Sequence, residues 1–244
     1  MRIALGLEYN GHKFCGWQYQ DNLRTVQACL EMAVSAVADH PIRVVCAGRT
    51  DTGVHALEQV VHFDTTVHRS SRAWVLGCNR LLPTDICIHW AKEVSDNFHA
   101  RFSATARQYR YIIYNNPIRP ALQHGLVTWF CHSLDEALMQ QAANYLVGEH
   151  DFASFRAKAC QAKTSIRNMQ NINLHREQDK IIIDFKANAF LHHMIRNIVG
   201  VLLEVGVERQ PPEWAKHLLD ARDRQLAAAT AKPDGLYLVG IEYG

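Results

Sequence analysis

The chain has 244 residues, of which 48% are hydrophobic and 20% charged, a composition that is typical of a globular protein with a substantial core and no low-complexity tract. The formal net charge of +2 does not by itself indicate a nucleic-acid binder, although 18 of the 26 basic residues are arginines, which suit bidentate phosphate contacts. The chain does not open on the continuous apolar core of a signal peptide, and no apolar stretch could span a membrane, so we expect a cytoplasmic protein.

The seven cysteines and fourteen histidines do not form a familiar metal-binding motif. The cysteines occur singly, without a C-x-x-C pair, and only His192 and His193 are adjacent histidines. Neither a His-Glu-x-x-His motif nor a Cys/His ligand spacing is present. We therefore expect reduced, mostly buried thiols and no structural metal.

The first half of the chain is predicted to alternate strands and helices. Apolar residues at every second position from Ile3 to Tyr9 predict a half-buried strand over residues 2–9. Thr25 is a candidate N-cap for a helix whose apolar face runs from Val26 to Val37. The remaining predicted elements are strands at 42–46 and 59–63, a helix from Ser70 to Leu82, and a strand at 86–94. This order is that of a ferredoxin-like unit.

The second half of the chain is also predicted to alternate strands and helices. Residues 106–114 alternate tyrosine and arginine with other residues and predict a strand, and Ser133 with Glu136 forms a capping box for a helix. The elements predicted after it are a hairpin of 165–174 with 180–187, a helix carrying Leu191 to Leu202, and a closing strand at 235–243. We predict an α+β fold with ferredoxin-like halves at 1–104, which holds the aspartate loop described next, and 105–244, which holds the tyrosine strand and a basic helix.

The loop from Ala47 to Ala56 is the longest run of small and polar residues without an apolar period. It places Arg49 and Asp51 two residues apart between Gly48 and Gly53, and glycine permits a tight loop that approaches a ligand. A neighbouring cation favours the ionised carboxylate that a nucleophile or general base needs. The alternative is that Asp51 only closes a turn onto its own backbone.

Three further segments hold polar residues that their predicted elements do not require. Arg107 and Tyr109 lie on one strand face, a spacing that suits stacking on a base beside a phosphate contact, although strand tyrosines commonly lie in a core. Arg196 lies in an apolar helix, either at the edge of its buried stripe, where it could reach a carboxylate, or on a solvent-exposed face. Residues 232–238 form either a functional segment or an ordinary Pro-x-Gly turn.

Several common catalytic motifs are missing from the sequence. It contains no Gly-x-x-x-x-Gly-Lys loop, no Gly-x-Gly-x-x-Gly after a strand and no Gly-x-Ser-x-Gly elbow. ATP chemistry, nicotinamide cofactors and serine hydrolysis are therefore not expected.

Taken together, these segments resemble the TruA-type tRNA pseudouridine synthases over almost the whole chain. Arg-Thr-Asp-x-Gly-Val-His-Ala is the most specific of the shared motifs. The matching segments are Tyr9-Asn10-Gly11, Gly16-Trp17-Gln18, residues 48–56, residues 79–86, residues 98–102, Tyr109-Arg110-Tyr111, residues 194–200 and Gly235-Leu236-Tyr237-Leu238.

The resemblance implies isomerisation of uridine to pseudouridine at positions 38 to 40 of the tRNA anticodon stem-loop. It implies a homodimer without metal or cofactor, built from two ferredoxin-like halves around a shared, mainly antiparallel sheet. The roles it implies are the catalytic aspartate for Asp51, substrate binding for Tyr109 and Arg196, RNA binding or base flipping for Arg49, Arg107 and Arg110, and active-site support for Leu236.

Two other functions fit parts of the sequence. A non-catalytic RNA-binding or tRNA-folding protein of the same fold would also carry the arginines, but it would not need a carboxylate facing an anionic ligand. A histidine-rich metal hydrolase would require zinc in the purified protein.

Overall fold

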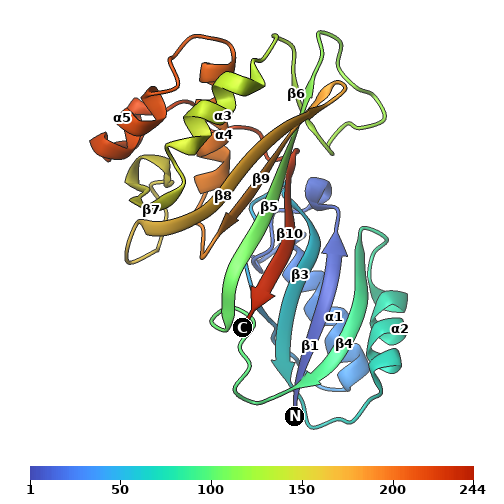
Figure 1. Ribbon diagram of the computed structural model, residues 1–244. Coiled ribbons are helices and arrows are strands. Elements are labelled where there is room, and N and C mark those ends of the chain that lie inside the picture. Colours follow the sequence, from blue (N-terminus) through green and yellow to red (C-terminus); the bar gives the residue numbers. More distant parts are fainter. The chain divides into compact units, whose positions relative to one another are not determined.

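The computed structural model describes all residues, 1–244. The chain forms two compact units, unit 1 with residues Met1–Thr105 and Tyr237–Gly244, and unit 2 with residues Ala106–Leu236. Each unit combines helices with a mainly antiparallel sheet (Figure 1). The predicted α+β class is therefore confirmed.

Unit 1 is built on a sheet in which β1 lies between β4 and β3. These three strands are antiparallel, whereas the C-terminal strand β10 pairs with β3 in parallel, and the short β2 pairs with another part of β3. The elements of this unit are β1 (Arg2–Tyr9), η1 (Gly11–Lys13), α1 (Val26–Ala38), β2 (Val45–Cys46), β3 (His55–Asp64), α2 (Ser71–Leu81), β4 (Ile86–Val94) and β10 (Leu236–Tyr243).

The core of unit 1 lies between the sheet and its two helices. Leu5 and Leu7, two residues apart on β1, both point into this core. Phe63 of β3 packs edge to face on Trp74 of α2, with ring centroids 5.2 Å apart. A smaller apolar cluster centres on Ala47, Val60 and Ala100, with side chains of the C-terminal strand packed on it. Unit 1 thus buries residues from both the first and the last strand of the chain.

Unit 2 contains the strand order β5-β9-β8-β7, with β6 parallel to β5. Its antiparallel β8–β9 hairpin turns at Gln178, which has a positive φ of 54°. The elements are β5 (Ala104–Asn115), β6 (Thr128–Phe130), α3 (Glu136–Asn144), β7 (Gly148–Asp151), η2 (Ala153–Phe155), β8 (Ile166–Glu177), β9 (Lys180–Ala187), α4 (Met194–Gly206), α5 (Trp214–Ala221) and η3 (Arg224–Leu226).

Most predicted elements are present with bounds close to those expected. The predicted strands 2–9 and 86–94 coincide with β1 and β4, and the Thr25 side chain caps α1 by accepting from the Ala28 amide. The predicted cap of α3 is wrong, because Asp135 and not Ser133 accepts from the first helical amides. The predicted strand 42–46 is reduced to two residues, and β6, β7 and α5 were not predicted.

The compact units and the predicted halves differ at the C-terminus. Residues 237–244, expected to close the second half, group with unit 1 through the pairing of β10 with β3. The division into halves at residue 104 stays a prediction. None of the helices is both long enough and apolar enough to cross a membrane.

Candidate active site

The loop that carries Asp51 joins β2 to β3 and is held at its start by a buried glutamine. Gln59 of β3 is fully buried, and its side-chain amide donates to the Gly48 carbonyl at 2.6 Å while its Oε1 accepts from the Gly48 amide at 3.3 Å. A buried side-chain amide must find such partners, since an unpaired one costs roughly 1–3 kcal/mol. The pairing therefore fixes the position where the chain leaves the sheet.

Thr50 anchors the middle of the loop. Its hydroxyl shares a hydrogen bond of 2.8 Å with the Tyr9 hydroxyl, and its carbonyl accepts from the Trp17 amide at 3.0 Å. Gly16, with φ of 81°, passes so close that a Cβ there would lie 2.9 Å from the Thr50 carbonyl oxygen. The close approach explains why this position requires glycine.

The end of the loop is a tight turn. The Val54 amide donates to the Asp51 carbonyl at 3.1 Å, and Gly53 occupies the turn with φ of 80°. His55 follows at the start of β3, where its Nδ1 accepts from the Gly11 amide at 3.0 Å and its ring stacks on Tyr237 at 4.5 Å. The 3-10 turn η1 and the strands β3 and β10 thus support this end of the loop.

The anchored backbone gives the loop's side chains different environments. Thr50 is buried, whereas its neighbours Arg49 and Asp51 are exposed and half-buried respectively. The fixed loop therefore holds the two predicted site residues of unit 1 at the surface. A carboxylate held in this way can serve as a nucleophile or general base without first reorganising the loop.

Unit 2 holds the other predicted residues, and three of them lie on β5. Tyr109 is 8% exposed, and its ring contacts Phe190 edge to face at 5.1 Å. Arg107, two residues earlier on the same face, donates from Nη1 to the Asn188 carbonyl at 2.9 Å. Arg110 lies on the opposite face of the strand and forms a bidentate ion pair with Asp184, which raises the pKa of the guanidinium.

Tyr111, the next residue on the Tyr109 face, is fully buried and bonded. Its hydroxyl shares a hydrogen bond of 2.6 Å with that of Thr128 and donates to the Lys232 carbonyl at 2.7 Å. Burial raises the pKa of Tyr111, and the hydrogen bond from Thr128 and the charge of Arg196 oppose that rise. The hydroxyl ties β5 to the segment that precedes β10.

Arg196 of α4 is tied to the same segment. Its Nε donates to the Ala231 carbonyl at 2.9 Å, and the Ala231 amide donates back to the Arg196 carbonyl at 3.1 Å. Leu236 is buried at the end of this segment, and its amide donates to the Pro233 carbonyl at 2.8 Å. The segment 231–236 is thus packed onto α4 and β5.

Several residues that support these positions were not identified from the sequence. Gln59, Tyr9 and His55 hold the loop, but a glutamine in a strand gives no local signal, and Tyr9 and His55 stand out only as members of shared motifs. In unit 2, Asn197 is buried, donates to the Phe155 carbonyl at 2.8 Å and accepts from Arg224 at 3.0 Å. The one sequence signal for Asn197 was its place as a polar residue within an otherwise apolar helix.

The fold and these motifs define a family of RNA-modifying enzymes. A sequence model described as tRNA pseudouridine synthase matches residues 7–103 and 142–244, so the chain belongs to the tRNA pseudouridine synthase family.

The chain is similar, over its whole length, to proteins named tRNA pseudouridine synthase A. The chain is 56% identical over 243 residues to the tRNA pseudouridine synthase A of Pseudoalteromonas translucida, with 100% of this chain and 92% of the relative covered. It is 57% identical over 243 residues to that of Nitrosococcus oceani, covering 94% of the relative, and 58% identical over 243 residues to that of Histophilus somni, covering 90%. Each of these two matches also covers 100% of this chain.

Proposed function

We propose that the protein isomerises uridine to pseudouridine at positions 38 to 40 of the tRNA anticodon stem-loop, with Asp51 as its catalytic group. The observation that carries the proposal is the anchored loop, in which Gln59, Tyr9 and Gly16 fix the backbone around the aspartate of the family motif. A loop anchored in this way holds the carboxylate in one geometry, which is what positioned catalysis requires.

The reaction makes clear demands on the site. The bond between ribose C1′ and uracil N1 breaks, the base turns while it stays bound, and C1′ bonds to C5. C5 then loses its proton, and N1 takes one up, so that the product is an isomer of the substrate. Asp51 assists either by attacking the sugar or the uracil ring, or by removing a sugar proton so that a glycal forms. All three routes use an ionised carboxylate at the target nucleotide.

The remaining residues have supporting roles in the proposal. Arg196 is the cation partner that keeps the catalytic carboxylate ionised, and Tyr109 stacks on the target base and is the candidate base for the C5 proton. Arg49 occupies the space that the flipped uridine leaves in the stem, which offsets part of the unstacking cost. Arg107 and Arg110 contact the RNA backbone, and Leu236 supports the base pocket.

The setting of the enzyme is part of the same proposal. Its seven cysteines are all unpaired, which suits the reducing cytoplasm where tRNA is modified. We propose that it acts there as a homodimer without a cofactor in its chemistry.

Release of tritium from C5-labelled uridine in unmodified tRNA tests this function. The natural protein should release tritium, and Asp51→Asn should lose at least about 10²-fold in rate, the lower range for a lost acid-base group, while tRNA binding persists. Asp39→Asn is the matched control, because Asp39 lies at the end of α1 in the left-handed region that asparagine tolerates. Release by Asp51→Asn at the natural rate contradicts the catalytic role.

The same assay tests Tyr109 and the alternative function. Tyr109→Phe keeps the ring and removes the hydroxyl, so a fully active variant restricts Tyr109 to stacking. Binding of tRNA without any tritium release by the natural protein would favour a non-catalytic RNA-binding protein.

A further inference from the structure

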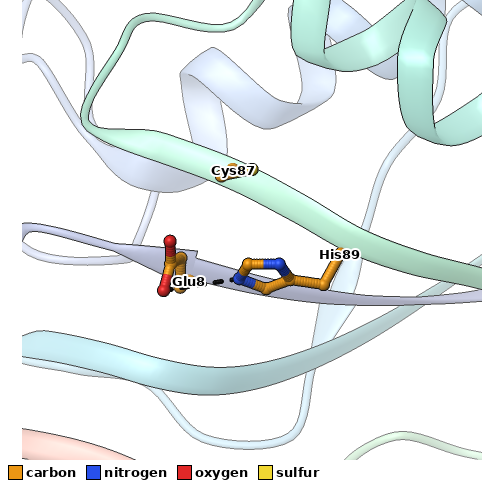
Figure 2. Close-up of side chains that lie close together, drawn as sticks. All are labelled: Glu8, Cys87 and His89. Atoms are coloured by element: carbon orange, nitrogen blue, oxygen red, sulfur yellow. Dashed lines mark ion pairs between the residues drawn. The ribbon is translucent and has the colours of Figure 1, made fainter.

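Three side chains of unit 1 that have no role in the proposed isomerisation gather on β1 and β4. They are Glu8, Cys87 and His89, and Figure 2 shows the His89 ring directed at the Glu8 carboxylate, with Cys87 on the same strand as His89. One possible ligand atom from each lies within 4.8 Å of those of the other two. Carboxylate oxygen, thiol sulfur and imidazole nitrogen are all metal ligands.

Strand pairing brings these residues together. Glu8 and Cys87 are direct partners in the antiparallel β1–β4 ladder, so their side chains leave the sheet on one face. The register shifts beside them, because Gly6 pairs with Trp90 and Leu7 with Ile88, which leaves His89 as the extra residue of a β-bulge. A bulge redirects a side chain, and here it turns His89 toward Glu8.

The separation of two of the three donor atoms suits a metal ion. His89 Nε2 lies 3.4 Å from Glu8 Oε2, which is long for a hydrogen bond between these groups. Zinc bonds of about 2.0–2.1 Å to nitrogen and oxygen, set at a tetrahedral angle, place two such ligand atoms about 3.3 Å apart. The pair therefore already has the spacing of two zinc ligands.

We propose that Glu8, Cys87 and His89 bind a zinc ion, with water as the fourth ligand. The mixed sulfur, nitrogen and oxygen set matches zinc, whereas calcium and magnesium require more oxygen ligands. Binding replaces the thiol proton by the metal, so one proton is released to solvent for each ion that binds to the protonated Cys87.

Solvent reaches the site from the edge of the sheet. His89 is exposed, and β4 is the edge strand of the unit 1 sheet. His89 also lines a groove of about 500 Å³ between β4 and residues Ser71 to Leu76 of α2. A hydrated ion can thus approach the imidazole without a change in the fold.

Cobalt substitution tests the site without reference to isomerase activity. The natural protein with one equivalent of Co²⁺ should show the ultraviolet charge-transfer absorption of a thiolate-bound ion. Cys87→Ser should lose this absorption, while Cys131→Ser, at an exposed cysteine outside the cluster, should keep it. Because outer-shell changes already weaken metal binding about 10- to 100-fold, Cys87→Ser and Glu8→Gln should each raise the zinc Kd at least about tenfold.

The outcomes separate this site from adventitious binding by other histidines. Absence of the charge-transfer absorption in the natural protein, or its equal loss in Cys131→Ser, would overturn the proposal. If Cys87→Ser does not fold, Glu8→Gln decides the question, because it keeps the thiol and an unchanged zinc Kd would also overturn the proposal. Circular dichroism of each metal-free variant establishes that it is folded.

Discussion

The buried Thr50 restricts the backbone of its two neighbours, Arg49 and Asp51. Thr50 is held by both its hydroxyl and its carbonyl, so the backbone around Arg49 and Asp51 has little freedom. Rigid presentation lowers the cost of organising charged groups for reaction. Arg49 is exposed, and it is the side chain that we propose enters the RNA stem.

Replacement of Arg49 should affect targets according to their pairing. We expect Arg49→Ala to slow modification of a uridine paired in the stem by about tenfold or more, since flipping costs a few kcal/mol, and to slow an unpaired uridine less. Single-turnover rates on two matched anticodon stem-loops measure the difference. Arg209→Ala, an exposed arginine of unit 2, serves as control, and an equal loss on both targets would argue against the flipping role.

A buried histidine should make stability depend on pH. His62 is 4% exposed, and its Nδ1 accepts from the Ala100 amide at 3.1 Å. Burial lowers its pKa from 6.5 to about 4, aided by the charges of Arg2 and His99 and opposed by Asp64. The unfolded chain therefore binds a proton at higher pH than the folded protein does. The contribution of His62 to the free energy of unfolding is therefore fully present above about pH 6.5, and it is lost as the pH drops toward 4.

His62→Asn tests this coupling, because the asparagine oxygen can accept the same bond without titrating. The free energy of unfolding of the natural protein should fall by about 2 kcal/mol between pH 7 and pH 5 from this group. The variant should lose that part of the fall, even if its stability at pH 7 is lower. If the free energy of unfolding, measured with urea, changed with pH in the same way for the natural protein and for His62→Asn, the lowered pKa would not belong to His62.

At the scale of single elements, α4 combines Arg196, the proposed partner of the catalytic carboxylate, with a close backbone crossing. Ala229 runs across the helix at Gly200, where an added Cβ would collide with the Ala229 carbonyl oxygen. At Gly206, the last residue of the same helix, a Cβ would lie 2.8 Å from Cδ2 of Leu134 and 2.8 Å from Sδ of Met139, both side-chain atoms. Flexible side-chain ends can move, whereas the crossing backbone cannot.

The two glycines form a matched pair for mutation. Gly200→Ala should destabilise the protein by about 1–3 kcal/mol or more, the range for overpacking. Gly206→Ala should change stability by less than about 1 kcal/mol, because the gain in helix propensity offsets the small repacking. Urea unfolding midpoints measure both, and equal effects would contradict the backbone crossing.

The sequence predicts elements best where periodicity alone determines them. Alternation in β1 and the Thr25 cap of α1 gave close bounds, and the predicted strand 86–94 coincides with β4. The α3 cap failed because Ser133 and Asp135 are both good caps and only the path of the preceding chain decides between them.

The contacts that the sequence could not predict in the two sites depend on pairing between strands that are distant in the chain. The Asp51 loop was apparent from its glycines and motif, but its support by Gln59 depends on how the strands pair. The cluster of Glu8 with Cys87 and His89 depends on the β1–β4 register and its bulge. A spacing search along the chain cannot find ligands that come from two distant strands.

At the scale of the whole molecule, the last eight residues complete the first unit. Deletion of residues 237–244 removes the parallel pairing with β3, the Tyr237 ring on His55, and the Tyr243 hydroxyl bond to the Ala100 carbonyl. We expect this truncation to abolish tritium release and to increase amide hydrogen exchange in β3. Tyr243→Phe, which removes only one hydroxyl, should retain most activity. Unchanged protection of β3 in the truncated protein would contradict this role.

The return of the C-terminal strand to unit 1 also bears on synthesis at the ribosome. Residues 1–105 emerge first, yet the edge of β3 at His55 and Ala56 lacks its partner until Tyr237 and Leu238 leave the exit tunnel. The support of the Asp51 loop is therefore incomplete until these residues have emerged. A nascent chain stalled in the second unit, or one shortened by a late stop codon, would present an open strand edge to chaperones and no working enzyme.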